Sequence, residues 1–183
     1  FLDRWKADKN NATSTVQHTS GIDIDGTSAI CRGMKILATS SATAYLGFRQ
    51  KIENPTQYVG RTFTYSGWVR ANRPCYLATY IQGVTQTVIS EPHSGSGGWE
   101  KLSVTFTMTG NPSTKWSVDA YVDNGAYGNG SIVTGDYMEL TMLQLELGSV
   151  ATDFEHRSYG EELALCQRYY QTYGYTEGGG IGA

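Results

Sequence analysis

Residues 99–108 read WEKLSVTFTM, and this stretch carries the clearest signal of the fold. After the opening tryptophan, its apolar residues stand at every second position, namely Leu102, Val104, Phe106 and Met108. Successive side chains of a β-strand point to opposite sides of a sheet, so this pattern predicts a strand with one buried and one solvent-facing side. The Gly-rich loop Pro92–Gly98 comes directly before the strand and marks where it begins.

The same alternation recurs along most of the chain. It predicts further strands at Ser14–Val16, Ile22–Ile24, Ala29–Leu37, Ala42–Ile52, Arg61–Ala71, Cys75–Gln82, Trp116–Asp123 and Tyr137–Leu147. The fourth of these has two distinct faces, one with Leu46, Phe48, Gln50 and Ile52 and the other with Tyr45, Gly47, Arg49 and Lys51. Many strands, long turns and no helical pattern before residue 160 predict an all-β fold, an antiparallel β-sandwich.

A different pattern follows Gly160. Leu163, Cys166 and Tyr170 recur at a helical spacing, which predicts a short helix with one apolar face before a Gly-rich tail. We therefore predict two parts, a sandwich domain of residues 1–157 and a helical connector with its tail at 158–183. So short an amphipathic helix is marginal alone in water, so it must pack on the sandwich or on its symmetry mates in an oligomer.

Composition narrows the classes of function. Only 17% of the 183 residues are charged and the net charge is −3, which predicts no nucleic-acid partner, because such binding needs a basic surface. The three cysteines, Cys31, Cys75 and Cys166, form no CxxC pair, which argues against a zinc site and a disulfide framework, although one disulfide stays open. No apolar window reaches membrane-spanning length, so we predict no membrane insertion.

Three segments resemble jelly-roll carbohydrate-binding modules. Gly98–Phe106 is similar to their strand that opens on Gly-Trp, Tyr65–Ala71 to their central strand, and Leu143–Gly148 to their closing strand. The resemblance implies a jelly-roll sandwich that binds sugar. It also raises the question of a structural calcium, because modules of this type often carry one.

Three other segments resemble phage tail-fibre proteins that contain such a domain. They are the opening Phe1–Trp5 and, after the closing strand, Val150–Arg157 and Gly160–Tyr170. This resemblance implies a receptor-binding domain of a homotrimeric tail fibre, made in the bacterial cytoplasm and carried on the virion. Its partners would be bacterial surface polysaccharide and other tail proteins. The resemblance also favours packing of the terminal helix against its symmetry mates.

Calcium prefers several oxygen ligands, and three aspartates lie in loop-like surroundings, namely Asp23, Asp25 and Asp136. However, the segment Ile22–Gly26 lacks the remaining oxygen ligands of a recognisable calcium loop. A structural turn is the preferred interpretation, so we predict no metal and no cofactor and leave calcium as an open alternative.

No catalytic motif is present. The histidines His18, His93 and His156 stand apart from one another, and no HExxH, GxSxG or phosphate-binding glycine motif occurs. His156, between Glu155 and Arg157, is interpreted as part of an ion-paired surface segment. Glycosidases need two carboxylates facing each other across a cleft, and nothing selects a pair among Asp119, Asp123, Asp136, Glu139 and Glu146. We interpret these acids as solvated or turn residues and predict a non-enzymatic protein.

A binding face follows from the direction of alternation. If Val69, Leu77, Phe106 and Val118 point to the core, six polar or aromatic residues point outward, namely Trp68, Arg70, Tyr76, Tyr80, Asp119 and Tyr121. On neighbouring strands they would suit a sugar, because aromatic rings stack on pyranose C–H groups while Arg and Asp hydrogen-bond the hydroxyls. Packing against a neighbouring subunit, or an inward Trp68 at a β-bulge, stays an alternative.

Together these observations predict a non-catalytic tail-fibre domain that attaches to host surface polysaccharide. Two alternatives stay open. The domain could be a spacer or trimerisation module that binds no ligand, or the accessory sugar-binding module of a depolymerase whose catalytic part lies outside this chain.

Overall fold

The computed structural model describes residues 5–9, 13–24, 31–43, 45–81, 86–109, 116–122 and 131–155, together with 160, 161 and 164. The chain divides into two compact units, Phe1–Thr152 and Asp153–Ala183. In the second unit, Gly160, Glu161 and Ala164 are helical, whereas the predicted helix-face residues Leu163, Cys166 and Tyr170 lie outside the described residues. No helix within the described part of the chain is long and apolar enough to cross a bilayer.

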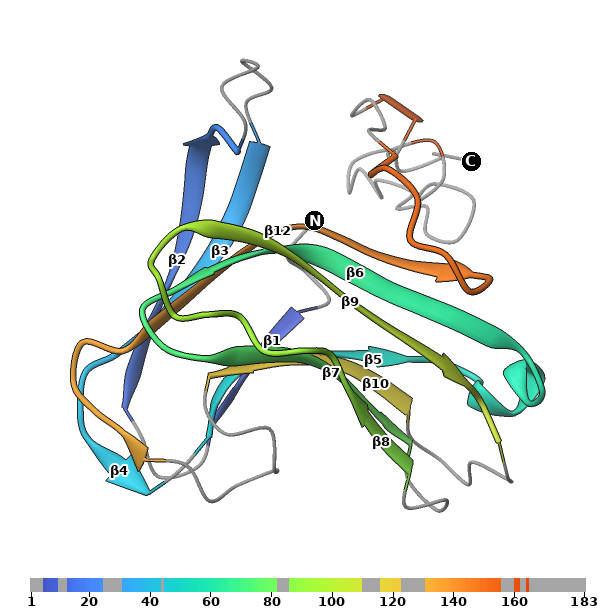
Figure 1. The fold of residues 1–183 in the computed structure, drawn as a ribbon, viewed down its shortest axis with the longest axis horizontal. Coiled ribbons are helices and arrows are strands. Elements are labelled where there is room, and N and C mark those ends of the chain that lie inside the picture. Colours follow the sequence, from blue (N-terminus) through green and yellow to red (C-terminus); the bar gives the residue numbers. More distant parts are fainter. Residues whose placement is uncertain are drawn as a thin grey trace, which may run out of the picture. The chain divides into compact units, whose positions relative to one another are not determined.

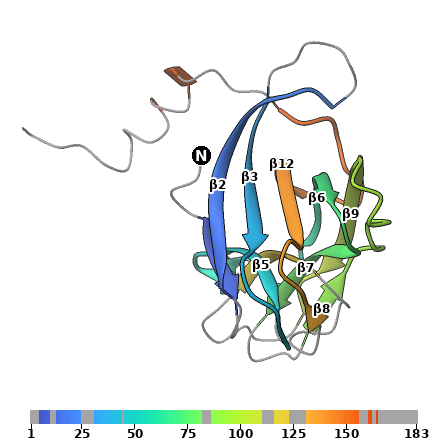
Figure 2. The same cartoon turned by 90° about the vertical axis from the view of Figure 1, so that its left-hand side faces the viewer.

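The first unit is a sandwich of two antiparallel five-stranded sheets (Figures 1 and 2). In spatial order, sheet A contains β1 (Trp5–Lys9), β5 (Leu46–Ile52), β10 (Trp116–Val122), β7 (Cys75–Ile81) and β8 (Gln86–Ile89). Sheet B contains β2 (Ser14–Ile22), β3 (Cys31–Ala38), β12 (Tyr137–Leu147), β6 (Thr62–Ala71) and β9 (Trp99–Thr107). Two short strands, β4 (Ala42–Thr43) and β11 (Ser131–Ile132), pair with each other, and a 3-10 helix, η1, spans Pro55–Tyr58. The chain crosses repeatedly between the sheets, as in a jelly roll.

The inner faces of the two sheets form one apolar core. Trp116 on β10 is almost fully buried, with its ring centroid 5.0 Å from that of Phe63 and 6.0 Å from that of Phe106, which both belong to sheet B. The residues predicted to face the core, Val69, Leu77, Phe106 and Val118, are all buried. Burying each such side chain stabilises the fold by about 1.5–3 kcal/mol, so this inner layer is what joins the two sheets.

The strand predictions are confirmed in the main, but the segment predicted as one strand at Ala42–Ile52 contains two, β4 and β5, and the short strand β11 was not predicted. Strand β2 runs from Ser14 to Ile22, so the strand predicted at Ser14–Val16 is the beginning of a longer one, and the separate strand predicted at Ile22–Ile24 was wrong. This strand is at the edge of sheet B and is largely exposed on both sides, so it lacks apolar alternation. The edge strands β1 and β8 of sheet A were missed because each is too short to show a period. The predicted starts and ends at Ala29, Gln82 and Asp123 lie outside the described residues.

Candidate functional site

The six residues predicted to bind a ligand lie on two opposite faces of the sandwich. Tyr76 and Tyr80 on β7, with Asp119 and Tyr121 on β10, lie on the outer face of sheet A. Trp68 and Arg70 lie on β6, on the outer face of sheet B. The expectation that all six share neighbouring strands is therefore wrong. Alternation shows whether a side chain points away from the core, but it does not show which sheet the strand joins.

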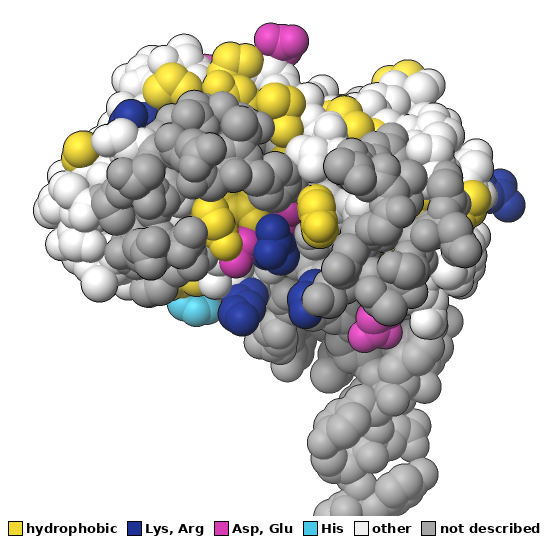
Figure 3. All heavy atoms as spheres, turned by 90° about the horizontal axis from the view of Figure 1, so that it is seen from below, with side chains coloured by type: hydrophobic (Ala, Val, Ile, Leu, Met, Phe, Trp, Pro, Cys, Tyr) yellow, Lys and Arg dark blue, Asp and Glu magenta, His cyan; other side chains and the backbone are white. Residues whose placement is uncertain are grey.

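The four residues on sheet A are close neighbours. Strands β7 and β10 pair so that Tyr76 lies directly opposite Tyr121, and Tyr80 lies opposite Ser117. On the other side of β10, strand β5 places Arg49 opposite Asp119 and Gly47 opposite Tyr121. We call this surface the tyrosine face and define it by Asp8, Tyr45, Arg49, Tyr76, Tyr80, Asp119 and Tyr121. Seen from the side of sheet A, basic, acidic and apolar side chains lie close together near the middle of the view (Figure 3).

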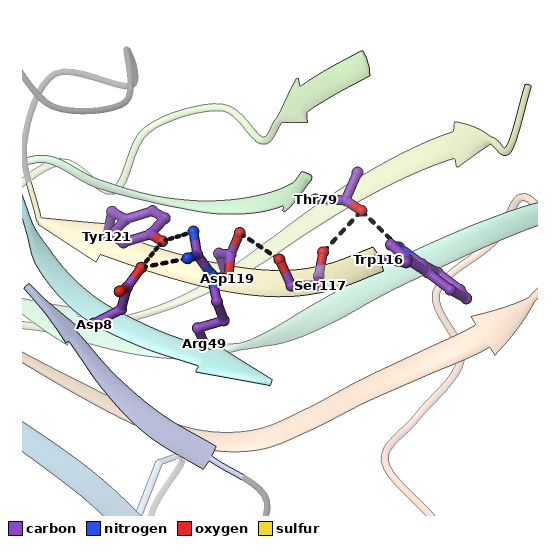
Figure 4. Close-up of polar contacts among 7 residues, drawn as sticks. All are labelled: Asp8, Arg49, Thr79, Trp116, Ser117, Asp119 and Tyr121. Atoms are coloured by element: carbon purple, nitrogen blue, oxygen red, sulfur yellow. Dashed lines mark hydrogen bonds and ion pairs between the residues drawn. The ribbon is translucent and has the colours of Figure 1, made fainter. Parts of the chain in front are cut away.

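Arg49 is the centre of a polar network on the tyrosine face (Figure 4). Its Nε donates a hydrogen bond to Asp119 Oδ1 over 2.8 Å, and its Nη1 lies 3.0 Å from Asp8 Oδ2. Its Nη2 donates to the Tyr121 hydroxyl over 2.6 Å, and that hydroxyl donates onward to Asp8 Oδ2 over 2.5 Å. All three guanidinium nitrogens are therefore engaged within the protein, and strands β1, β5 and β10 are linked through their side chains.

Burial sets the charge states in this network. The Asp119 side chain has no exposed surface, and a buried carboxylate must be paired to stay charged. Burial alone would lower the pKa of Arg49, but the charge of Asp119 and its hydrogen bond raise that pKa above its ordinary value. Burial, and then the charge of Asp119, raise the pKa of Tyr121. Arg49 therefore stays a cation and Tyr121 stays neutral, which gives each hydrogen bond one direction.

A second chain of hydrogen bonds links this network to the core. Ser117 Oγ donates to Asp119 Oδ2 over 3.2 Å, and Thr79 Oγ1 donates to the Ser117 carbonyl oxygen over 3.2 Å (Figure 4). The indole Nε1 of Trp116 donates to Thr79 Oγ1 over 2.9 Å. Because the Trp116 ring is packed within the sandwich, the position of Asp119 is held by the core as well as by Arg49.

Gly47 makes room for the Tyr121 ring. A Cβ atom at this position would lie 2.6 Å from Tyr121 Cδ1 and 2.0 Å from the carbonyl oxygen of Ala120. The Tyr45 ring meets the Tyr121 ring edge-on at a centroid distance of 5.4 Å. Tyr121 itself is only 7% exposed, whereas Tyr45, Tyr76 and Tyr80 are half-buried, so these three present ring surface to solvent.

Three members of the tyrosine face were not predicted as site residues. Tyr45 and Arg49 belong to the outward set of the predicted strand Ala42–Ile52, so the alternation already contained the signal that could have found them. Asp8 lies on β1, which was not predicted as a strand. Its contact with Tyr121 spans 113 positions of sequence, and no local pattern predicts such a pair.

On the outer face of sheet B, the predicted residue Arg70 is ion-paired within the protein. The Arg70 guanidinium donates to the buried carboxylate of Glu139 through Nε and Nη2, and its central carbon lies 5.1 Å from the centroid of the Trp99 ring. Strand β12 has a β-bulge between Thr141 and Gln144. The bulge is not in β6, and Trp68 stays on the outer face because its neighbour Val69 is fully buried on the inner one.

The interpretation of the five acids as solvated or turn residues was wrong for Asp119 and Glu139, whereas Asp136 is a turn residue but is not solvated. Asp119, Asp136 and Glu139 are buried, and each is ion-paired with an arginine. Asp136 also accepts a hydrogen bond from the Val133 amide over 2.8 Å, so it holds a turn. Glu146 accepts one from the Thr152 amide over 3.1 Å, and Asp123 lies outside the described residues.

The remaining metal candidates give no cluster within the described residues. There, no three His, Cys, Asp or Glu side chains come together as metal ligands would. Of the aspartates considered for calcium, Asp23 is exposed and Asp25 lies outside the described residues. His93 is fully buried, accepts a hydrogen bond from the Gly95 amide at Nδ1 over 2.8 Å, and holds the loop before β9. His156 also lies outside the described residues.

Several solved structures share this fold. The enzymatically active domain of tailspike protein 4 from bacteriophage CBA120 matches with a TM-score of 0.57 and 12% identity, over 81% of this chain and 20% of that one. A xylan-binding domain of carbohydrate-binding module family 22 matches with a TM-score of 0.53 and 13% identity, over 82% and 92%. An arabinose-bound α-L-arabinofuranosidase matches with a TM-score of 0.52 and 15% identity, over 81% and 24%.

At these identities the likeness shows the fold alone, a β-sandwich like those of carbohydrate-binding modules. The match covers only a fifth of the tailspike domain, 20% of its length. No family model and no curated protein matches the sequence.

Proposed function

We propose that this chain is a non-catalytic domain that binds polysaccharide through the tyrosine face of sheet A. In this proposal it belongs to a phage tail fibre or a related receptor-binding protein. There it attaches to polysaccharide on the bacterial surface, assembles as a homotrimer with other tail proteins, and is carried on the virion after synthesis in the host cytoplasm.

The observation that carries the proposal is the form of the tyrosine face. Tyr45, Tyr76 and Tyr80 are partly exposed and lie beside a network in which Arg49 is ion-paired with both Asp8 and Asp119. Tyrosine suits sugar recognition because its ring stacks on C–H groups while its hydroxyl exchanges hydrogen bonds. The rings stand on paired strands held to the core through Asp119 and Trp116, so little conformational entropy is lost when a ligand binds.

The fold also supports this proposal. One of the structures that it resembles is a xylan-binding domain that the match covers almost completely, and another is part of a phage tailspike. The first is consistent with a polysaccharide ligand and the second with a place in a phage tail. Each remains a proposal for this chain.

A non-catalytic role is supported by the state of the two carboxylates on the tyrosine face. Asp119 is buried and bound to Arg49 and Ser117, and Asp8 is ion-paired with Arg49 and accepts a hydrogen bond from Tyr121. A general acid must hold a proton and reach the glycosidic oxygen, whereas these groups are engaged with the protein. Incubation with bacterial capsule polysaccharides should release no reducing sugar, and release by the purified chain would contradict this part of the proposal.

Binding can be tested by isothermal titration with purified surface polysaccharides from several bacteria. The double substitution Tyr76→Ala and Tyr80→Ala should weaken binding at least about tenfold, because stacking on an aromatic ring contributes roughly 1 kcal/mol or more. The control is Trp68→Ala, an aromatic truncation on the outer face of the other sheet, which should leave Kd unchanged. If Trp68→Ala abolished binding and the double substitution did not, the binding site would lie on sheet B.

The spacer alternative makes a different prediction. If the domain only assembles the fibre, no polysaccharide binds, and the Tyr76→Ala and Tyr80→Ala variant changes the oligomeric state instead. Light scattering on the purified chain should give the mass of a trimer. A monomer would contradict the trimer, and it would leave sugar binding to be judged by titration alone.

A further inference from the structure

The basic residues on the outer face of sheet A differ in whether they are paired with other side chains of the protein. Arg49 engages all three of its guanidinium nitrogens with Asp8, Asp119 and Tyr121, so its side chain is held within the protein's own network. Two lysines lie beside it on the same face. Lys6 on β1 is directly opposite Arg49, and Lys51 follows Arg49 by two positions on β5.

Both lysine side chains are exposed, and within the described part of the chain neither forms an ion pair. The outward charged residues on the described strands of sheet A are thus three cations, Lys6, Arg49 and Lys51, and two anions, Asp8 and Asp119. Both anions pair with Arg49. The five charges therefore give this face a net charge of +1, with the two lysines as its exposed cations, whereas the whole chain carries a net charge of −3. Figure 3 shows basic side chains near the middle of this face.

Protection of a sheet edge is the usual structural role of an exposed lysine, and it would account for Lys6 on the edge strand β1. It does not account for Lys51, because β5 lies between β1 and β10 inside the sheet. A negatively charged ligand lying over the face would give both lysines the same role.

We infer that the tyrosine face binds an acidic polysaccharide, with carboxylates of the sugar chain paired to Lys6 and Lys51. This inference rests on the proposed sugar-binding function and names the class of ligand. The tyrosine rings stack on the sugar while the two ammonium groups bind its carboxylates. Arg49 stays in its internal network and acts as a positioning residue for Tyr121 and Asp119.

The test uses the intact chain and three uronic-acid polymers, namely polygalacturonate, alginate and hyaluronate, each beside its own carboxyl-reduced form. Isothermal titration should show binding to at least one of the acidic polymers and about tenfold weaker binding to its carboxyl-reduced form. The double substitution Lys6→Gln and Lys51→Gln should weaken binding to the acidic polymer by about the same factor. The matched control, Lys35→Gln with Lys101→Gln, removes two charges from sheet B and should leave Kd unchanged.

Salt provides a second readout. Raising the ionic strength from about 0.01 M to about 1 M shortens the Debye length from about 30 Å to about 3 Å, so binding by the unmodified chain should weaken. The variant without Lys6 and Lys51 should respond much less to salt. Dextran sulfate measures attraction by charge alone, and binding to it as tight as to the best uronic-acid polymer would overturn the inference.

The outcomes separate the two proposals. Suppose the carboxyl-reduced polymer binds as tightly as the acidic one, and only the Tyr76→Ala and Tyr80→Ala variant loses affinity. Sugar binding then stands, and the assignment of an acidic ligand is wrong. If neither these polymers nor the bacterial polysaccharides bind at all, both proposals fail.

Discussion

Arg49 on β5 and Asp119 on β10 form an ion pair with 2.8 Å between Nε and Oδ1, and the Asp119 side chain has no exposed surface although it stands on the outer face of sheet A. The pair is part of a network that also holds Asp8 and Tyr121. The polar groups of the tyrosine face are thus held in place by the protein itself. Substitutions in this network should therefore change the free energy of unfolding as well as ligand binding.

Arg49→Met should destabilise the domain by about 3 kcal/mol, because it leaves the carboxylate of Asp119 buried without its partner. Urea unfolding followed by tryptophan fluorescence measures the change, with the m value expected to stay the same. Lys51→Met, two positions along the same strand but exposed, should alter stability by no more than about 0.5 kcal/mol. Adding Asp119→Leu to Arg49→Met should restore part of the loss. Additive losses would contradict the coupling.

Tyr121→Phe should destabilise the domain by about 1–2 kcal/mol. The hydroxyl accepts a hydrogen bond from Arg49 and donates one to Asp8, so its removal leaves both partners short of one contact. Chemical unfolding of this variant beside the unmodified chain gives the difference. An unchanged midpoint would mean that the network contributes no stability.

Tyr65→Phe removes the same hydroxyl group on the inner face, but this substitution should stabilise the domain. Tyr65 is 1% exposed, and its hydroxyl has no hydrogen-bond partner among the described residues. A buried hydroxyl without a partner costs free energy, so removing it should raise the unfolding free energy by about 1 kcal/mol. A lower unfolding midpoint for this variant would show that the hydroxyl has a partner after all.

Stability should fall at alkaline pH. Burial, and then the charge of Asp119, raise the pKa of both Tyr65 and Tyr121 in the folded domain, so the unfolded chain loses these protons first, near pH 10. Their contribution is fully present below that pH. It is lost above it at up to about 1.4 kcal/mol per pH unit for each tyrosine. Unfolding free energies measured across this range should show a shallower decline in Tyr121→Phe, and an equal slope would contradict the assignment.

Gly47→Ala should impair both stability and binding. The added methyl group would overlap the Ala120 carbonyl oxygen and the Tyr121 ring, and such overpacking costs about 1–3 kcal/mol. The displaced ring should also weaken polysaccharide binding in titration. Gly98→Ala, on an exposed loop where the nearest atom would be 3.4 Å away, is the matched control and should change neither property. A stable Gly47→Ala variant with unchanged Kd would show that β5 and β10 can separate without disturbing the site.

Part of the candidate site could be predicted from the sequence. Tyr76, Tyr80, Asp119 and Tyr121 were predicted to point outward, and they do share one face. Trp68 and Arg70 were placed with them only because alternation cannot distinguish one sheet from the other. Arg49 stood in the outward set of its strand, but nothing in the sequence showed that it would be the common partner of two aspartates.

The sequence by itself determined the class of fold, most of the strands and the residues of the core. These properties follow from the alternation of apolar and polar residues along each strand, which is a local pattern and can be recognised in one sequence. The tertiary structure alone decided which strands became neighbours and which charges were paired. Arg49 and Asp119 are 70 positions apart, and their contact exists only because β5 and β10 pair in one particular register. That register depends on the burial of the whole core, so it cannot be predicted from any single segment of the sequence.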